Sequence, residues 1–387
     1  MMARNGSAAR CLLGNVSCYG QPNVTSYLGD LRLLAAVTSL NDTMEPEEDV
    51  SGREFYLMAQ LVTGLVFYPL FCLFGLTGNI LSIIVLSGRQ MATSTNSFLV
   101  GLAVADTIKL TNDAFYSVVT LLIHVNPQAG YRALHYMYPY AHYFFNVSVC
   151  ITAWLSVAVA AERYMLVCHA TRARTLCSIA RARATVIFVF LSMGVLTTPL
   201  ALRYRTVPVH HNDTNDTSYS VDVTDLWRVR SFVVAYTWSQ NCMRSLIPIA
   251  ILCTLSYFIV RSLRRTRPPT KRRQTSRRRI TIMLVSVIVV FVVCVTPDAV
   301  ISTVYGFGYY EADYVVRGVR EITDLLLTVN SAVNFVLYCT FNHIFRKNFI
   351  ALFCSQPQNR SSFSSHNLRL SFATFRQSTV NEQKEDT

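Results

Sequence analysis

The chain has 387 residues, of which 52% are apolar and only 15% are charged. A soluble domain usually carries about 25% charged residues, so this deficit excludes an ordinary soluble domain and indicates a membrane protein. The formal net charge is +13, and the basic excess gathers in residues 261–279, where ten Lys and Arg residues stand without an acid. Such a run can bind nucleic acid, but the apolar stretches on both sides favour a cytoplasmic loop, and we expect no nucleic-acid partner.

Seven stretches of the chain are long and apolar enough to cross a bilayer, which takes roughly 20 predominantly apolar residues in a helix. We therefore predict an all-α membrane protein whose core, within residues 56–341, is a bundle of seven transmembrane helices. The expected spans are about 57–87, 98–123, 139–167, 183–203, 232–260, 280–304 and 322–341.

Two independent signals give the orientation of these helices. The stretches that follow the third and the fifth helix are basic, and cytoplasmic loops carry an excess of Lys and Arg. Sequons for N-glycosylation fall on the opposite side, at Asn5, Asn15, Asn23, Asn41, Asn212 and Asn215. We expect a multi-pass protein of the plasma membrane, with residues 1–55 as an extracellular glycosylated tail in which Cys11 and Cys18 are either bridged or both free.

The chain after the seventh span divides into two parts. Residues 342–354 carry apolar side chains such as Phe345 and Phe349 beside basic ones such as Lys347, and we expect a short amphipathic eighth helix on the membrane surface. Cys354 at its end is a candidate for palmitoylation. Residues 355–387 are polar and rich in serine, so we expect a disordered cytoplasmic tail that offers phosphorylation sites.

The tripeptide Glu162-Arg163-Tyr164 closes the third apolar run. An acid or an arginine at mid-bilayer costs about 2.5–3.5 kcal/mol by insertion scales, so the pair is expected at the membrane–water boundary instead. There Arg163 can exchange partners, which makes it a candidate conformational switch. The alternative is an interfacial ion pair with no further role.

Short motifs stand at corresponding depths on the expected helices: Gly78-Asn79, Leu102-Ala103-Val104-Ala105-Asp106, Glu162-Arg163-Tyr164, Pro248, Phe291 with Cys294 and Pro297, and Asn334-Phe335-Val336-Leu337-Tyr338. In this order they resemble the rhodopsin-like (class A) G protein-coupled receptors, over about residues 55–354. The resemblance implies a signalling receptor rather than an enzyme, which activates heterotrimeric G proteins by outward motion of the sixth helix. It also implies receptor kinases and arrestin as partners of the tail, and either the G protein or membrane lipids as partners of the loop 261–279.

Several phrases are similar to the invertebrate FMRFamide receptors and related neuropeptide receptors. They are Tyr136-Met137-Tyr138-Pro139, Val167-Cys168-His169 followed by Arg174-Thr175-Leu176-Cys177, and Leu327-Thr328-Val329-Asn330-Ser331-Ala332-Val333-Asn334-Phe335. This similarity implies an extracellular, FMRFamide-like peptide ligand. An orphan or constitutively active receptor for a different ligand is the alternative.

The sequence also departs from the family pattern. Most members bridge a cysteine at the outer end of helix three to the loop between helices four and five, but that position is Tyr138 and residues 203–231 contain no cysteine. Val295 stands where a tryptophan usually precedes the helix-six proline. An acidic latch often found at the inner end of helix six is replaced by Arg277-Arg278-Arg279, which suggests a leaky resting state.

The resemblance assigns two groups of residues to the mechanism. At rest Arg163 is held by Glu162, and after release it helps to form a cleft for the G protein, with Tyr338 and Tyr257 as supports. Deeper in the bundle, the carboxylate of Asp106 faces a polar cavity that holds a sodium ion, formed with Asn79, Ser331 and Asn334. A protonated, hydrogen-bonded aspartic acid is the alternative, and we expect no other cofactor or metal.

The outer halves of the expected helices carry a set of ionisable side chains, namely Lys109, Asp113, Arg244, Asp298, Glu321 and Asp324. Such residues are rare inside membranes and mark functional sites. Lys109 and Asp113 are four residues apart and are expected to pair.

We predict that Asp298, Asp324 or Glu321 binds the arginine of an Arg-Phe-amide peptide, because guanidinium and carboxylate match bidentately. Asp113 and Arg244 belong to the same candidate ligand site. Internal salt bridges that only shape the pocket are an equally open alternative. Aromatic surface for the peptide is expected from Tyr116, Tyr140, Phe144, Trp238, Tyr305 and Phe307.

Three other classes fit the sequence less well. A retinal-binding photoreceptor needs a lysine in the seventh helix, and residues 322–341 contain none. A transporter is expected to show paired, glycine-interrupted half-helices, and a membrane enzyme a catalytic motif such as His-Glu-x-x-His. We find neither pattern.

Overall fold

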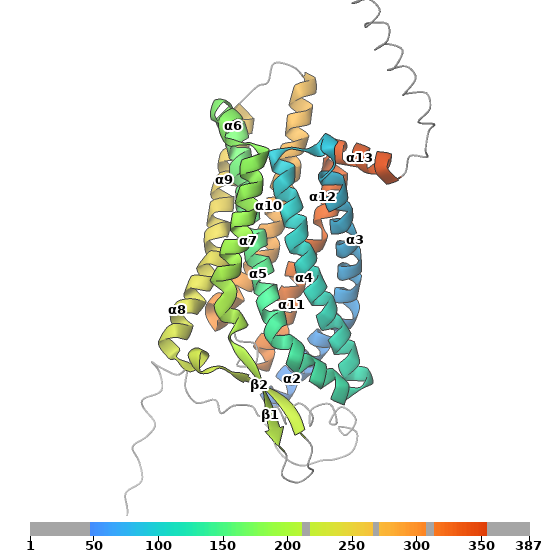
Figure 1. Ribbon diagram of the computed structural model, residues 1–387, viewed down its shortest axis with the longest axis vertical. Coiled ribbons are helices and arrows are strands. Elements are labelled where there is room, and N and C mark those ends of the chain that lie inside the picture. The colour runs from blue at the N-terminus through green and yellow to red at the C-terminus, as the bar shows by residue number, and fades with distance from the viewer. Residues whose placement is uncertain (1–46, 211–216, 266–270, 307–312, 354–387) are drawn as a thin grey trace, which may run out of the picture.

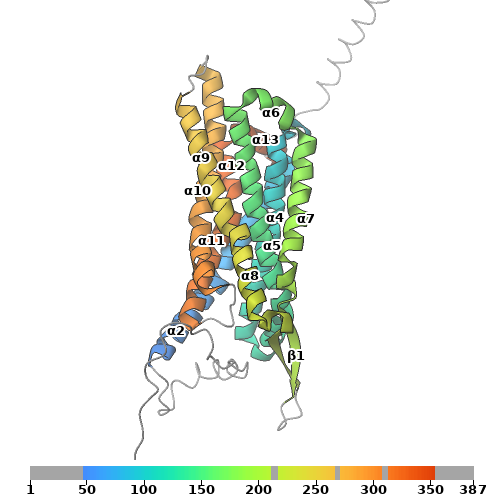
Figure 2. The same ribbon diagram turned by 90° about the vertical axis from the view of Figure 1, so that its left-hand side faces the viewer.

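The computed structural model describes residues 47–210, 217–265, 271–306 and 313–353. These residues form an elongated bundle of long helices, with a small β-hairpin at one end and the short helix α13 lying across the other (Figures 1 and 2). We call these the hairpin end and the α13 end. The predicted tail residues 1–46 and 354–387, with Cys354 and all six predicted glycosylation sites, lie outside the described residues.

The elements follow one another along the chain as helices, apart from one hairpin. They are α2 (Glu47–Val62), η1 (Thr63–Phe67), α3 (Tyr68–Leu86), η2 (Arg89–Met91), α4 (Ser94–Val125), α5 (Pro127–Cys168), α6 (Ala170–Leu176), α7 (Ile179–Ala201), β1 (Tyr204–His210), β2 (Thr217–Val223), η3 (Asp225–Arg228), α8 (Arg230–Asn241), η4 (Cys242–Leu246), α9 (Ile247–Arg265), α10 (Lys271–Tyr305), α11 (Tyr314–Ala332), α12 (Asn334–Phe341) and α13 (His343–Phe353). The strands β1 and β2 pair antiparallel, with Tyr204 opposite Val223.

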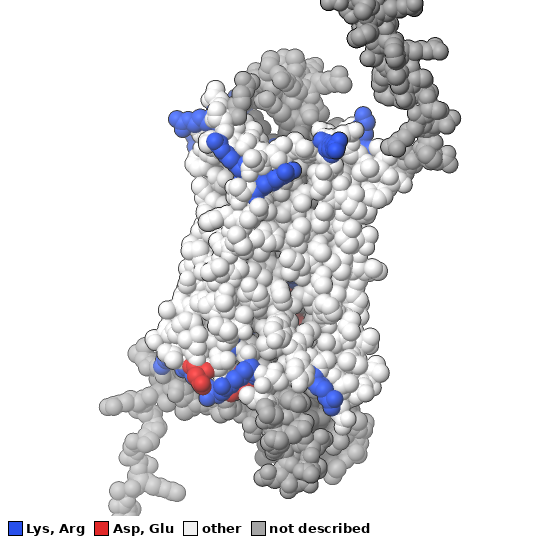
Figure 3. Space-filling model, in the orientation of Figure 1, with Lys and Arg blue, Asp and Glu red and all other residues white. Residues whose placement is uncertain are grey.

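Among the described residues, six helical segments are long and apolar enough to cross a membrane: Val50–Leu86, Pro127–Cys168, Ile179–Ala201, Arg230–Ser262, Val285–Tyr305 and Tyr314–Phe341. A band without charged side chains runs around the middle of the face shown in Figure 3, and Lys and Arg gather at both ends. The chain is therefore a multi-pass membrane protein. The remaining long helix, α4, runs beside α3 and α5 (Figure 1) but has a more polar sequence, since it contains Asp106, Lys109 and Asp113, all buried.

The helices are longer than the apolar stretches that predicted them. Helix α2 begins at Glu47, before the boundary at residue 55 that we expected, and α5 begins at Pro127 rather than near residue 139. At the start of α5 the side chain of Asn126 accepts a hydrogen bond from the backbone N–H of Ala129. Such an N-cap with proline at the first helical position starts a helix irrespective of hydropathy.

Two π-helical turns shift the register of long helices. One of them, η4, ends two residues before Pro248, which has no N–H to donate to the carbonyl of Arg244. The π-helical turn contains one residue more than an α-helical turn. This extra residue accommodates the missing hydrogen bond and rotates the helix locally. In the other, η1, the hydroxyl of Ser117 on α4 donates to the carbonyl of Gly64 at 2.7 Å.

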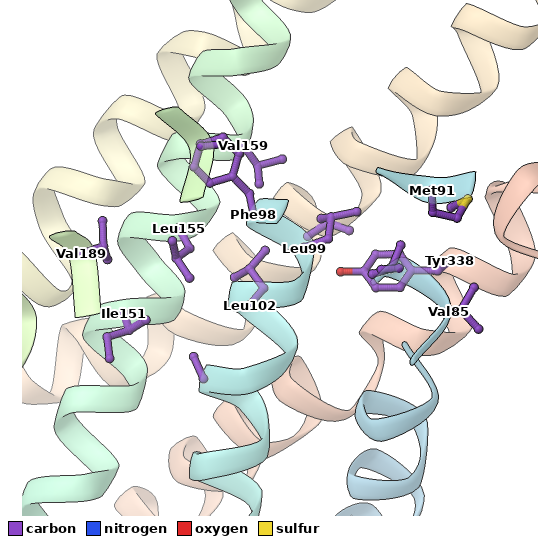
Figure 4. Close-up of a cluster of buried hydrophobic side chains, with 14 of the residues drawn as sticks. Val85, Met91, Phe98, Leu99, Leu102, Ile151, Leu155, Val159, Val189 and Tyr338 are labelled. Atoms are coloured by element: carbon purple, nitrogen blue, oxygen red, sulfur yellow. The ribbon is translucent and has the colours of Figure 1, made fainter. Parts of the chain in front are cut away.

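The largest group of buried apolar side chains lies between α3, α4, α5 and α7 and extends to α12. Figure 4 shows Leu99, Leu102, Leu155 and Val159 of this core, together with Tyr338 of α12. The α13 helix joins the same core through Phe345, which is fully buried. Its other apolar side chains, Ile344, Ile350, Leu352 and Phe353, are about half exposed.

The span Tyr314–Phe341 is interrupted at Val333, between α11 and α12, although no proline stands there. The next residues pack tightly: the ring of Phe335 contacts the rings of Phe345 and Phe349 of α13, with centroid distances of 6.0 and 5.7 Å. On its other side Phe335 lies against Gly78 of α3, where a Cβ would come within 2.8 Å of the Phe335 Cβ.

Substitution of Gly78 by alanine is therefore expected to destabilise the fold by roughly 1–3 kcal/mol, the usual cost of overpacking a core. The matched control is Gly194→Ala in α7, where the nearest atom to a new Cβ is 3.8 Å away. There alanine only improves helix propensity. Thermal unfolding of the detergent-solubilised protein measures both changes, and a Gly78→Ala variant as stable as Gly194→Ala contradicts the packing described here.

Candidate functional site

At the α13 end of the bundle, Glu162 and Arg163 of α5 are joined through the start of α4. The hydroxyl of Thr95 donates to Glu162 at 2.6 Å and accepts from the guanidinium of Arg163, and Ser94 also donates to Glu162. Within the described residues the two charges form no direct ion pair. We expected a direct ion pair between Arg163 and Glu162. In the structure the two side chains are connected by hydrogen bonds through the hydroxyl of Thr95, which the sequence motif did not predict.

The aromatic residues expected beside Arg163 occupy different positions. Tyr164 packs on His169 and Phe258, with ring centroids 5.4 and 6.1 Å away. Tyr338 is buried in the core, and its hydroxyl has no hydrogen-bond partner among the described residues.

The other predicted support, Tyr257, lies on the outer surface of α9. Its side chain is 59% exposed and only accepts a hydrogen bond from Arg261 at 3.4 Å. One face of α9 is buried, and it carries Leu252 and Ile259. Ser256 lies on the same face, and its hydroxyl is also buried. Tyr257 is one position further along the helix, which turns it about 100° away from the bundle.

In the middle of the bundle, the carboxylate of Asp106 is fully buried and accepts hydrogen bonds from three side chains, one of them that of Ser331. Asn334 donates to it at 2.7 Å and Thr152 at 3.2 Å. Asn79 instead donates to the backbone carbonyl of Ser331 at 3.0 Å, and its own side-chain oxygen is buried without a hydrogen-bond partner. The four predicted residues thus come from four helices that meet here, α3, α4, α11 and α12, and Thr152 of α5 is an additional member.

Further toward the hairpin end, Lys109 and Asp113 form the expected ion pair, at 2.5 Å. The hydroxyl of Thr328 on α11 lies between them: it accepts from Lys109 at 3.0 Å and donates to Asp113 at 2.8 Å. Lys109 also stands over the ring of Phe145, 5.0 Å from its centroid. Both charges are almost completely buried, so this pair is internal to the bundle.

A second internal pair joins the π-helical turn η4 to α10. Arg244 lies 2.7 Å from the carboxylate of Asp298, and both side chains are at most 6% exposed. Arg244 also donates a hydrogen bond to Asn146 at 3.2 Å. Its guanidinium stands over the ring of Phe145, 5.5 Å from the centroid, so it shares this ring with Lys109. Because η4 rotates the helix, the guanidinium points into the bundle rather than toward lipid.

Glu321 is buried in a third polar group, formed with the first helical span. It accepts hydrogen bonds from Tyr116 at 2.9 Å and from Thr63 of η1 at 3.2 Å, and Gln60 donates to Tyr116 at 3.1 Å. Of the predicted aromatic residues, Tyr116 is therefore part of this internal network.

Asp324 differs from the other predicted acids. In the described part of the chain, its carboxylate forms neither a hydrogen bond nor an ion pair. Arg320 stands one turn before it on α11, 7% exposed, and donates to the carbonyl of Gly306 at 2.5 Å. We had not predicted Arg320, because hydropathy placed the start of this helix near residue 322, whereas α11 begins at Tyr314, capped by Asp313. A search for N-cap residues before residue 322 would have found it.

The remaining predicted aromatic residues lie largely on the surface of the bundle. Tyr140, Phe144, Trp238 and Tyr305 are 47–68% exposed, and Phe307 lies outside the described residues. Trp238 makes no ring contact or side-chain hydrogen bond within the described residues, so the structure gives it no link to the charged groups.

Residues 78–338 match the family model described as 7 transmembrane receptor (rhodopsin family). The chain belongs to this family, a family of signalling receptors and not of enzymes.

Among individual relatives, the chain is similar to receptors for neuropeptides. It is 28% identical to the FMRFamide receptor of Drosophila melanogaster over 295 residues, which cover 74% of this chain and 53% of that receptor. It is 26% identical to the sex peptide receptor of the same species over 330 residues (74% and 71% of the two chains). It is also 26% identical to the somatostatin receptor type 1 of Rattus norvegicus over 291 residues (74% and 70%). The chain thus spans about half the length of the FMRFamide receptor that it matches.

Proposed function

We propose that the protein is a plasma-membrane receptor for an extracellular peptide, FMRFamide-like in ending on an arginine and an aromatic amide, and that it activates heterotrimeric G proteins. In this proposal α4 is the second of seven spans, so the hairpin end and the N-terminus are extracellular. Helix α13 is the amphipathic eighth helix, and its half-exposed apolar side chains lie in the inner membrane surface. The tail, with Cys354 as a palmitoylation site, would meet receptor kinases and arrestin.

The observation that carries the ligand assignment is that the carboxylate of Asp324 forms no hydrogen bond and no close ion pair within the described residues, although Arg320 lies within electrostatic range. Asp113, Asp298 and Glu321 already have partners inside the bundle, so binding a ligand cation there would first break an internal contact. A carboxylate without a partner near the bundle interior is costly, and a guanidinium from a ligand removes that cost with two parallel hydrogen bonds. Asp324 is therefore the acid that a peptide arginine binds.

Asp324→Asn is expected to lower the potency of an amidated Arg-Phe peptide roughly 30-fold or more, the effect of removing one partner of a buried charge pair. Calcium and cyclic-nucleotide responses of expressing cells measure potency, and an epitope at residue 1, read on intact cells, measures surface expression.

Two control variants separate ligand binding from folding. Asp225→Asn changes an acid near the hairpin that is 80% exposed, and it is expected to leave potency and expression unchanged. Asp298→Asn breaks the internal pair with Arg244 and is expected to lower surface expression. Wild-type potency of Asp324→Asn contradicts the assignment, and an epitope that is accessible only after permeabilisation contradicts the orientation.

At the α13 end, we propose that Thr95 holds Arg163 and Glu162 in a resting arrangement, and that release of Arg163 opens the G protein site. Thr95→Val preserves the shape of the side chain but removes its hydrogen bonds to both charges. Because a hydrogen bond to a charged group contributes about 1.5–3 kcal/mol, basal G protein signalling is expected to rise about tenfold.

Thr254→Val is the matched control for this change. Thr254 is exposed on α9 and bonds only its own helix, through the carbonyl of Ala250. Basal activity of Thr95→Val that equals that of Thr254→Val would show that Thr95 does not restrain the switch.

For the middle of the bundle, we propose that Asp106 binds a sodium ion together with Asn79, Ser331 and Asn334. The support is chemical. The buried carboxylate of Asp106 accepts a hydrogen bond from the Asn334 amide of α12, and the Asn79 amide donates to the Ser331 carbonyl of α11. The side-chain oxygen of Asn79 has no hydrogen-bond partner in the described residues. Oxygen ligands of this kind suit a small hard cation, and a bound cation would compensate both groups.

The purified protein is therefore expected to melt at a higher temperature in sodium chloride than in choline chloride. At about ten times the dissociation constant, bound sodium raises the free energy of unfolding by about 1.4 kcal/mol. Asp106→Asn removes this difference, whereas Asp113→Asn, which alters an ion-paired acid, keeps it. Equal melting temperatures of the wild-type protein in the two salts would refute the sodium site.

A further inference from the structure

The β1–β2 hairpin is attached to the bundle without a disulfide. Residues 203–231 contain no cysteine, and the cysteines in the described part of the chain are free. The hairpin nevertheless contacts α5 along its first residues and stands at the end of the bundle in both views (Figures 1 and 2). Some other interaction must hold it there, since two strands alone are only marginally stable.

Arg203, between α7 and β1, lies at the centre of that attachment. Its side chain is 3% exposed, and its guanidinium stands over two rings, 4.5 Å from the centroid of Trp227 and 5.2 Å from that of Tyr204. A cation between two aromatic faces is most strongly attracted when it is shielded from water. Arg203 thus connects the first residue of β1 to η3, on the far side of the hairpin.

Tyr204 continues the contact from the hairpin to α5. Its ring lies edge-on to that of Tyr138, with centroids 5.0 Å apart, and also meets the imidazole of His142 at 5.5 Å. Tyr204 itself is 5% exposed. Tyr138 occupies the helix position at which the sequence comparison expected a cysteine, so an aromatic contact stands where a covalent one was expected.

Hydrogen bonds fix both edges of this group. Trp227 donates from its indole nitrogen to the carbonyl of Pro199 at 2.9 Å, Thr224 donates to Leu202 at 2.6 Å, and Thr206 donates to the carbonyl of His135 on α5 at 3.0 Å. The rings of Phe232 and Tyr236 of α8 pack edge-on against Trp227. The start and the end of the hairpin are therefore bound to α5, α7 and α8 together.

We propose that Arg203, Tyr204 and Trp227, with Tyr138 and His142, form an aromatic clamp that anchors the extracellular hairpin to the bundle and replaces a disulfide. His142 also lies within electrostatic range of Arg244 and Arg320. The clamp therefore borders the charged groups near Asp324, and, if the proposed function holds, it positions the hairpin beside the peptide. Because it contains no thiol, it is insensitive to reducing conditions.

A second arginine, Arg205 on β1, lies two residues after Arg203 and provides a matched control. Arg205 is 46% exposed and pairs with Asp222 at 3.1 Å. Burial raises the pKa of Asp222, but hydrogen bonds from Arg205, Arg228 and the Val223 amide outweigh it and hold the pKa below its usual value. Exposed pairs of this kind contribute little to stability. Substitution of Arg205 therefore removes one positive charge from the hairpin and leaves the aromatic clamp intact.

Hydrogen–deuterium exchange of the purified full chain tests the proposal without any ligand. Arg203→Gln is expected to accelerate exchange of the backbone amides in 204–210 and 217–223 by about tenfold, the change that corresponds to losing a shielded cation–π contact. Arg205→Gln and the wild-type protein in dithiothreitol are expected to exchange at the wild-type rate. Because no peptide is used, the outcome does not depend on the proposed function.

Two substitutions of Tyr204 show whether the hairpin is held by an aromatic ring or by any apolar side chain of sufficient size. Tyr204→Phe keeps the ring and is expected to retain wild-type exchange, whereas Tyr204→Leu accelerates it as Arg203→Gln does. The proposal is overturned if Arg203→Gln exchanges like Arg205→Gln, if Tyr204→Leu behaves like Tyr204→Phe, or if dithiothreitol alone accelerates exchange of the hairpin.

Discussion

A charge surrounded by hydrocarbon must find an opposite charge or strong hydrogen bonds within the protein, and this constraint organises the interior of the bundle. Lys109 is neutralised by Asp113, and Arg244 by Asp298. Both cations also share the ring of Phe145, from α5, so the two pairs tie α4, α5, α10 and η4 together. Without these pairings, Lys109 and Arg244 would each leave an uncompensated charge inside the bundle.

The same constraint gives functional meaning to the groups that are incompletely satisfied. In the described part of the chain, the side-chain oxygen of Asn79 is buried without a hydrogen-bond partner. The carboxylate of Asp324 interacts with Arg320 only through space, without a hydrogen bond or a close ion pair. At the α13 end, Arg163 shares a single hydroxyl with Glu162. Ligand, ion and G protein are thus each proposed to act at a place where the protein leaves a charge or a dipole only partly compensated.

Much of this arrangement follows from the sequence, because hydropathy detects the apolar middle of each span and motif order detects the family. The ends of the helices were missed where polar residues continue the helix, as at Glu47 and Pro127. Arg320 was missed for the same reason. The exposed position of Tyr257 could not be predicted, because a motif identifies the helix but the rotation of the helix depends on packing, and the hydroxyl of Ser256 is the one that is buried.

The pairing of charges was predictable only where both partners lie on one helix. Lys109 and Asp113 are four residues apart, and their ion pair was expected. The partners of Asp298 and Glu321 come from other helices, so their identity depends on how the bundle assembles. For the same reason the sequence did not single out Asp324 from the other acids. The sequence analysis also did not predict the hairpin, because residues 203–231 contain no cysteine that would indicate a disulfide there.

The break in the seventh span at Val333 has a mechanical consequence. A proline would make such a bend permanent, because it removes a donor and clashes with the preceding turn. Here Phe335 keeps its amide, and regular hydrogen bonds continue on both sides, from Val333 to Val329 and from Leu337 to Val333. The rings of Phe345 and Phe349 on α13 pack against Phe335 beside the break. Because no backbone donor is lost there, the shape of this segment depends on side-chain packing, which a single substitution in α13 can alter.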